Sequence, residues 1–181
     1  MGSWVAFHTA LLAPERVRGM VLIGALHRLA AQPGMSELLA AVHDLDDPVD
    51  REFITEFQRS TVHQPIPEGF LQLVVDESAK LPAAVWRRCF DALVVDDPEP
   101  RLGEIDVPVR LLWGAHDDVT GHDGQLALVR ALPQAHLVAY PEFGHAPHWE
   151  DPVRVAADIA GFAGALLAGG RSAADSAVQP T

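Results

Sequence analysis

Three short runs of hydrophobic residues are the clearest pattern along the chain. They cover residues 17–25, 107–114 and 135–140, and each is rich in Val, Leu and Ile with little alternation. Near-continuous apolar runs of this length are typical of parallel strands covered on both faces, whereas half-exposed strands alternate. The pattern therefore predicts three buried parallel strands.

Helical patterns surround these runs. Residues 4–12 are apolar on nearly all sides, which suits a buried helix, and residues 125–132 lead into the third run. A last helix is expected after Asp151, a capping residue, with Pro152 at its first position. Its apolar stripe consists of Val155, Ile159, Phe162 and Leu166. Strands that alternate with helices predict an α/β fold with right-handed crossovers.

The middle of the chain breaks this alternation, because it predicts three helices and no strand. The first is expected to start at Asp47-Pro48 and to pack within the cap through one apolar stripe, Val49, Phe53 and Phe57. The second is expected to carry the apolar positions of residues 70–75, and the third those of residues 85–93. Helices inserted between two strands of one sheet form a cap over the strand ends, where open α/β sheets bind ligands. We therefore expect a helical cap.

These elements divide the chain into three parts. Residues 1–31 and 101–168 form the expected α/β core, and residues 32–100 form the expected helical cap. Residues 169–181 are small and polar, which predicts a flexible tail.

Composition and charge narrow the function classes. The 181 residues contain 13 Lys and Arg against 25 Asp and Glu, a formal net charge of −12. Such an acidic chain lacks the clustered cations that nucleic acid or anionic membranes require, so neither is an expected partner. A single cysteine, Cys89, excludes an internal disulfide, and no apolar run is long enough to span a membrane. The N-terminus has no basic leader, so we expect a soluble, cytoplasmic protein without a cofactor.

Candidate chemistry lies where two of the predicted strands end. Asp117 follows the second run within Gly-Ala-His-Asp, and His145 follows the third within Pro-Glu-Phe-Gly-His. Because neighbouring parallel strands end at the same edge, about 4.8 Å apart, the two loops can bring Asp117 to His145. A buried carboxylate that accepts the ring N–H would hold the imidazole in the tautomer needed for proton transfer.

The chain resembles the C-terminal part of the α/β-hydrolases, which include esterases, lipases, epoxide hydrolases and dehalogenases. Residues 144–152, GHAPHWEDP, are similar to the family's segment around the catalytic histidine, and residues 113–117, WGAHD, to the turn that carries the catalytic acid. Residues 13–17, APERV, are similar to the segment after the nucleophile helix. The resemblance covers nearly the whole chain except the tail. One departure is Val119-Thr120-Gly121 where many members have a proline.

The resemblance implies hydrolysis of small esters, lactones or related substrates by a nucleophile, His145 and Asp117. The family's nucleophile sits in G-x-S-x-G, and Met1-Gly2 of this chain aligns with the last two positions of that motif. The nucleophile is therefore expected to precede Met1, together with five strands and one oxyanion donor. The backbone N–H of Met1 would be the other donor in a longer chain. An aspartate nucleophile would instead imply epoxide hydrolase or haloalkane dehalogenase chemistry.

Other interpretations of the whole chain remain open. It could be a catalytically inactive truncated chain or binding remnant, or its start could have been assigned too late within a normal enzyme. Ser3 is an alternative nucleophile, although the alignment places it two positions too far along, and Asp118 is an alternative acid.

Metal and pocket assignments complete the expectations. A metal could involve His145, His148 and Glu150, but Pro147 disfavours the helical spacing that such sites use, so none is expected. Asp117, Asp118, His122 and Asp123 are a second candidate group for a cation, but Asp118 and Asp123 are interpreted as solvated loop carboxylates.

Three aromatic side chains are expected to line a substrate pocket, namely Trp149, His148 and Trp86. Cys89 is interpreted as a packed thiol. The expected partners are a small-molecule substrate and further copies of this chain, because the strand over residues 17–25 would form an exposed sheet edge.

Overall fold

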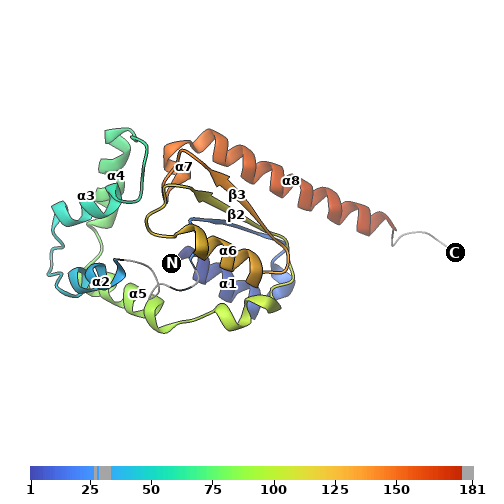
Figure 1. The fold of residues 1–181 in the computed structure, drawn as a ribbon, viewed down its shortest axis with the longest axis horizontal. Helices are drawn as coiled ribbons and strands as arrows, with labels where there is room; N and C mark the ends of the chain where they lie inside the picture. Colours follow the sequence, from blue (N-terminus) through green and yellow to red (C-terminus); the bar gives the residue numbers. More distant parts are fainter. Residues whose placement is uncertain (27, 29–33, 177–181) are drawn as a thin grey trace.

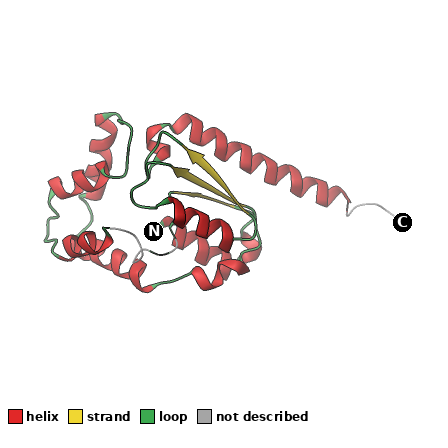
Figure 2. Cartoon of the chain, viewed as in Figure 1, coloured by secondary structure: helices red, strands yellow, loops and turns green. Residues whose placement is uncertain are grey.

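A three-stranded parallel sheet with helices on both faces forms the core of the computed structural model, which describes residues 1–26, 28 and 34–176. The strands are β1 (Met20–Ile23), β2 (Val109–Gly114) and β3 (Ala135–Tyr140), in the order β1-β2-β3. A separate group of helices stands beyond the strands' carboxyl ends (Figures 1 and 2). The predicted α/β fold with three parallel strands is confirmed.

The strand register brings apolar residues side by side across the sheet. Leu22 of β1 pairs with Leu111 of β2, which pairs with Leu137 of β3. β1 is shorter than the hydrophobic run that predicted it, because a short 3-10 helix, η1 (Pro14–Arg16), precedes it and Gly24 turns the chain at φ 53° directly after it.

Helices cover the two faces of the sheet with different residues of the same strands. On one face, α1 (Gly2–Leu12) and α6 (His122–Ala131) pack on Met20, Leu22, Val109 and Leu111. On the other face, α8 (Pro152–Ser176) packs on Leu112 and Tyr140 through Val155. Because both faces are buried, the strands need apolar residues at nearly every position, which explains their continuous hydrophobic runs.

The last helix begins where its capping signal predicts. Asp151 accepts a hydrogen bond from the backbone N–H of Arg154 at 2.9 Å, which satisfies one of the free donors of the first turn. α8 continues to Ser176, into the segment expected as a flexible tail. Among the helices that the structure describes, none combines the length and the apolarity needed to cross a membrane.

The cap contains four described helices, and not the three that the sequence predicted. They are α2 (Met35–His43), α3 (Arg51–Arg59), α4 (Glu68–Ser78) and α5 (Ala83–Val95), and η2 (Glu99–Glu104) leads back to the sheet. The helix that the sequence analysis missed is α2, since no element was assigned to residues 35–43. The expected boundary between core and cap, at residues 31 and 32, lies outside the described residues.

The first predicted cap helix was also placed too early. α3 begins at Arg51, and Asp50 caps it by accepting a hydrogen bond from the backbone N–H of Glu52 at 2.9 Å. Asp47, the expected start, instead accepts the backbone N–H of Ala83 at 2.6 Å. Asp47 and Asp50 are both capping residue types, and the contact of Asp47 with Ala83 leaves Asp50 as the cap.

Candidate active site

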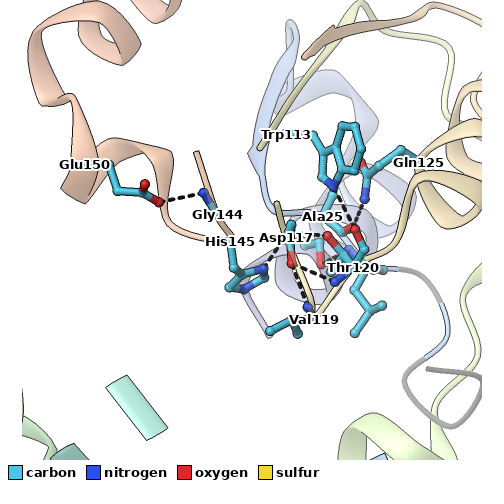
Figure 3. Close-up of polar contacts among 11 residues, drawn as sticks. Ala25, Trp113, Asp117, Val119, Thr120, Gln125, Gly144, His145 and Glu150 are labelled. Atoms are coloured by element: carbon cyan, nitrogen blue, oxygen red, sulfur yellow. Dashed lines mark hydrogen bonds and ion pairs between the residues drawn. The ribbon is translucent and has the colours of Figure 1, made fainter. Parts of the chain in front are cut away.

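Asp117 is buried in the loop that follows β2, with its side chain fully shielded from solvent. Its Oδ1 accepts the backbone N–H groups of Val119 at 2.8 Å and Thr120 at 2.7 Å, and its Oδ2 accepts the hydroxyl of Thr120 (Figure 3). These donors supply the hydrogen bonds that a buried carboxylate needs. Thr120 therefore helps to hold the carboxylate at a place where many family members have proline.

His145 lies in the loop after β3 and faces this carboxylate. Its Nδ1 is 2.9 Å from Oδ2 of Asp117, and 28% of its side chain is exposed (Figure 3). A carboxylate can only accept, so Nδ1 carries the proton and donates, which leaves Nε2 on the opposite side of the ring as the acceptor. The predicted pairing of Asp117 with His145 is present, and Asp118 is exposed.

Gly24, at the carboxyl end of β1, completes the seat of the imidazole. A Cβ at this position would lie 2.7 Å from Nδ1 and 2.8 Å from Cε1 of His145. The ring edge therefore packs against the bare α-carbon, and the positive φ of Gly24 favours glycine further. All three strands thus contribute, because β1 supplies the contact surface, β2 the acid and β3 the histidine.

The loop of Asp117 is held from the sheet side as well. The indole Nε1 of Trp113, in β2, donates to the carbonyl of Thr120 at 2.7 Å. Gln125, at the start of α6, donates to the carbonyl of Ala25 at 2.7 Å (Figure 3). Both donors are buried. The first bond holds the loop of Asp117 against β2, and the second holds the start of α6 against the segment after β1.

Glu150 joins the histidine loop to the cap. One carboxylate oxygen accepts the backbone N–H of Gly144 at 2.7 Å, next to His145, and the other accepts the backbone N–H of Gln64 at 2.7 Å. The backbone N–H of Ala146 donates to the carbonyl of Thr61 at 2.9 Å. The cap segment after α3 is therefore hydrogen-bonded to the histidine loop next to His145, through Glu150 and through the backbone of Ala146.

Two further contacts extend this junction. The rings of His63 and His116 stack with 3.8 Å between centroids, and the side-chain amide of Gln64 donates to the carbonyl of Glu142 at 3.0 Å. His116 directly precedes Asp117 in the chain. The cap therefore touches both of the loops that carry the acid and the histidine.

A cavity of about 450 Å³ opens between the cap and the strand ends, and His145 lines it. Most of its lining is aliphatic or aromatic and comes from the cap helices and the segment after β1. The described lining residues are Met1, Gly24, Leu26, Met35, Leu38, Phe53, Glu56, Phe57, Ser60, Thr61, Phe90, Leu93, Val119 and His145. A histidine held by a carboxylate beside an apolar cavity is an arrangement typical of an active site.

The aromatic residues predicted to line the pocket lie elsewhere. Trp86 is buried in the cap, with its ring 5.3 Å from that of Phe57, and Trp149 packs on Phe70 at 5.7 Å. His148 neighbours Trp149, and none of the three belongs to the described lining. Partial burial and the neighbouring charge of His145 lower the pKa of His148. The signal missed by sequence reasoning was the stripe of Phe53 and Phe57, assigned only to cap packing.

Ser3, the alternative nucleophile, is engaged with the segment after β1. Its hydroxyl donates to the carbonyl of Leu26 at 3.1 Å and accepts the backbone N–H of the same residue at 3.4 Å. Met1, in contrast, lines the cavity together with His145. In the ranges that the structure describes, no three His, Cys, Asp or Glu side chains are grouped to hold a metal ion.

Sequence comparisons match this chain to hydrolases. A family model described as the alpha/beta hydrolase fold matches residues 1–152. A 2-hydroxy-6-oxo-6-phenylhexa-2,4-dienoate hydrolase of Burkholderia cepacia is 26% identical over 83% of this chain and 55% of its own length. A pimeloyl-[acyl-carrier protein] methyl ester esterase of Neisseria meningitidis is 28% identical over 81% of this chain and 49% of its own. The chain thus spans about half the length of these curated relatives.

Solved structures show the same fold. An esterase from Exiguobacterium antarcticum superposes with a TM-score of 0.77 at 16% identity, over 88% of this chain and 62% of that one. A 2-hydroxy-6-oxo-6-phenylhexa-2,4-dienoate hydrolase from Rhodococcus sp. strain RHA1 superposes with a TM-score of 0.68 at 25% identity, over 88% of this chain and 59% of that one.

Proposed function

Because this chain belongs to the alpha/beta hydrolase family, we propose that it carries the histidine and the acid of an enzyme that hydrolyses small esters, lactones or related substrates. The observation that supports this most is the 2.9 Å contact of His145 Nδ1 with the buried carboxylate of Asp117, beside an apolar cavity of about 450 Å³. A cavity of that size suits a small substrate.

The two residues have distinct roles in this proposal. Asp117 accepts the Nδ1–H of His145, holds the ring in one tautomer and stabilises the imidazolium that forms when Nε2 takes a proton. In the first step His145 takes the proton of the nucleophile, which becomes acylated, and gives that proton to the leaving alcohol. In the second step His145 takes a proton from water, which releases the acid, and returns that proton to the nucleophile. The proton thus moves through Nε2 alone, and Asp117 stays ionised throughout.

The nucleophile is proposed to be the residue that precedes Met1 in a longer chain, with serine favoured over aspartate. Two contacts support this position. Met1 lines the cavity with His145, as the residue after the nucleophile should, and the hydroxyl of Ser3 is bonded to Leu26. In that longer chain the backbone N–H of Met1 would be one oxyanion donor.

Ester hydrolysis is favoured over the other chemistries of the family for two reasons. One matched relative is by name a methyl ester esterase, and Met1-Gly2 fits the S-M-G sequence of those family members in which Met follows a serine nucleophile. The 181 residues alone, without a nucleophile beside His145, are proposed to be inactive.

Labelling with a fluorophosphonate tests this proposal, together with hydrolysis of p-nitrophenyl acetate and butyrate. The whole natural protein that contains these residues should hydrolyse the esters and take one label at the residue before Met1, whereas the 181 residues alone should do neither. A label on Ser3, lost in Ser3→Ala, would overturn the placement of the nucleophile. Turnover of epoxides or haloalkanes without labelling would show that the nucleophile is an aspartate. If the whole protein turned over none of these substrates, the interpretation as a catalytically inactive protein would replace this proposal.

A further inference from the structure

One carboxylate stands among the apolar residues of the cavity. Phe53, Glu56, Phe57 and Ser60 are spaced three, one and three residues apart along α3, which places them on one helical face. All four line the cavity that His145 also lines, and α3 lies in the part of the cap beyond the strand ends (Figure 1). Glu56 is itself exposed, so its carboxylate lies at the solvent-accessible side of the cavity, next to the half-buried Phe53 and Phe57.

The nearby cations of the same helix are paired with other acids. Arg59 contacts Glu68 at 3.2 Å, and Arg51 contacts Asp76 at 2.5 Å. The lining residues that the structure describes include neither arginine nor lysine. Among these lining residues, positive charge would come from a protonated His145, because Met1 has a peptide nitrogen and no amino group in the proposed longer chain. The cap side of the cavity is thus negative and otherwise apolar.

We propose that Glu56 determines the charge of the substrate, so that the cavity takes esters with a neutral or cationic acyl chain and rejects those with a carboxylate. This inference rests on the proposed esterase function. A carboxylate on the acyl chain would leave water for a mostly apolar lining and would face the like charge of Glu56, whose exposure leaves that repulsion partly screened by solvent.

A cationic group on the substrate should bind more favourably in this cavity than a carboxylate. An ammonium group at the cap end would face Glu56, and Phe53, Phe57 and Phe90 line the same space with aromatic rings. Aromatic faces attract cations, and a carboxylate adds direct charge pairing. The same matched relatives include a hydrolase whose named substrate, a dienoate, is itself a carboxylate, so this cavity predicts a different substrate preference from that relative.

Three methyl esters of similar acyl length, followed by titration of the acid released, test the charge preference in the whole natural protein. They are the neutral methyl butyrate, the anionic monomethyl succinate and the cationic methyl 4-(trimethylammonio)butyrate. The expected kcat/KM for the anionic ester is at least about tenfold below that for the neutral ester, and the cationic ester is hydrolysed at least as well as the neutral one. Equal kcat/KM values for the anionic and neutral esters would overturn the proposal.

Variants of α3 distinguish an effect of the Glu56 carboxylate from an effect of the overall charge of the protein. Glu56→Gln should raise the ratio of kcat/KM for the anionic to the neutral ester about tenfold, and Glu56→Lys should invert the preference. Glu52→Gln removes the same charge from a residue of α3 that is exposed like Glu56 but lies outside the described lining, and it should leave the ratio unchanged. A ratio that moves equally in Glu52→Gln and Glu56→Gln would contradict a role of Glu56 in the cavity.

Binding distinguishes failure of this inference from failure of the esterase function. If no ester is hydrolysed, calorimetric titration with butyltrimethylammonium and with pentanoate still measures the charge preference. The cation should bind at least about tenfold more tightly than the anion to the wild type, and Glu56→Gln should remove most of that difference. Equal affinities in the wild type would overturn the charge preference, whatever the catalytic outcome.

Discussion

The imidazole of His145 packs directly against the α-carbon of Gly24, at a distance that leaves no room for a methyl group. A Cβ on Gly24 would lie 2.7 Å from both Nδ1 and the backbone oxygen of His145. Since Nδ1 is the atom that donates to Asp117, the same contact that seats the ring also protects its hydrogen bond. The end of β1 therefore sets the position of the proposed base.

Gly24→Ala should consequently impair both stability and activity. The new methyl group must push His145 away from Asp117, and alanine is also strained at φ 53° by about 1–2 kcal/mol. Gly34→Ala is the matched control, because Gly34 has φ 71° but a Cβ there would meet nothing within 4 Å. Thermal unfolding should show a loss of stability in both variants, whereas ester hydrolysis should fall only in Gly24→Ala. Equal activity in the two variants would contradict this seat for His145.

The acid can be tested at two adjacent carboxylates. Asp117→Asn should lower ester hydrolysis by the whole protein on the order of 10³-fold, similar to His145→Ala, because the amide no longer selects the tautomer that leaves Nε2 unprotonated. Asp118→Asn is the control, since Asp118 is exposed, and it should change the rate by less than about twofold. Steady-state kinetics of the two variants measure these effects. A larger loss of rate in Asp118→Asn would show that Asp118, and not Asp117, is the catalytic acid.

Glu150 is expected to support the site through the cap junction. In Glu150→Gln, an amide group replaces one oxygen and must meet the backbone N–H of Gly144 or Gln64, two donors face to face. The free energy of unfolding should fall by about 1–3 kcal/mol, with lower activity because His145 follows Gly144. Glu142→Gln loses only an exposed pair with Arg154, so it should cost at most about 1 kcal/mol. Denaturant unfolding of both variants makes the comparison, and equal costs would show that the junction contributes little.

The pairing of Asp117 with His145 was predictable because each residue follows a recognisable strand, and neighbouring parallel strands end at one edge. The cavity was not predictable in the same way. Glu150 meets Gln64 across 86 residues of chain, a contact that no local pattern encodes. Phe57 matched its helical stripe, but the stripe does not reveal which side faces a cavity and which faces Trp86.

We predict that the 181-residue chain associates with itself, because of two features of its surface. β1 pairs only with β2 among the described strands, which leaves one edge open, and on α1 the side chains of Val5 and Leu12 are 61% and 79% exposed. These two residues are seven positions apart, so they share one helical face. Open strand edges and exposed apolar faces both promote association between copies.

Sedimentation velocity and binding of a hydrophobic dye measure this association. The 181-residue chain should form dimers or larger species as its concentration rises, and should bind the dye. The double variant Val5→Glu, Leu12→Glu should weaken both signals, because each charge must be desolvated if the α1 face is buried between copies. Val153→Glu is the control, since Val153 is equally exposed, at 79%, but lies on α8 across the sheet. A wild-type chain that stays monomeric without binding dye would contradict the prediction, and an equal response to Val153→Glu would place the contact away from α1.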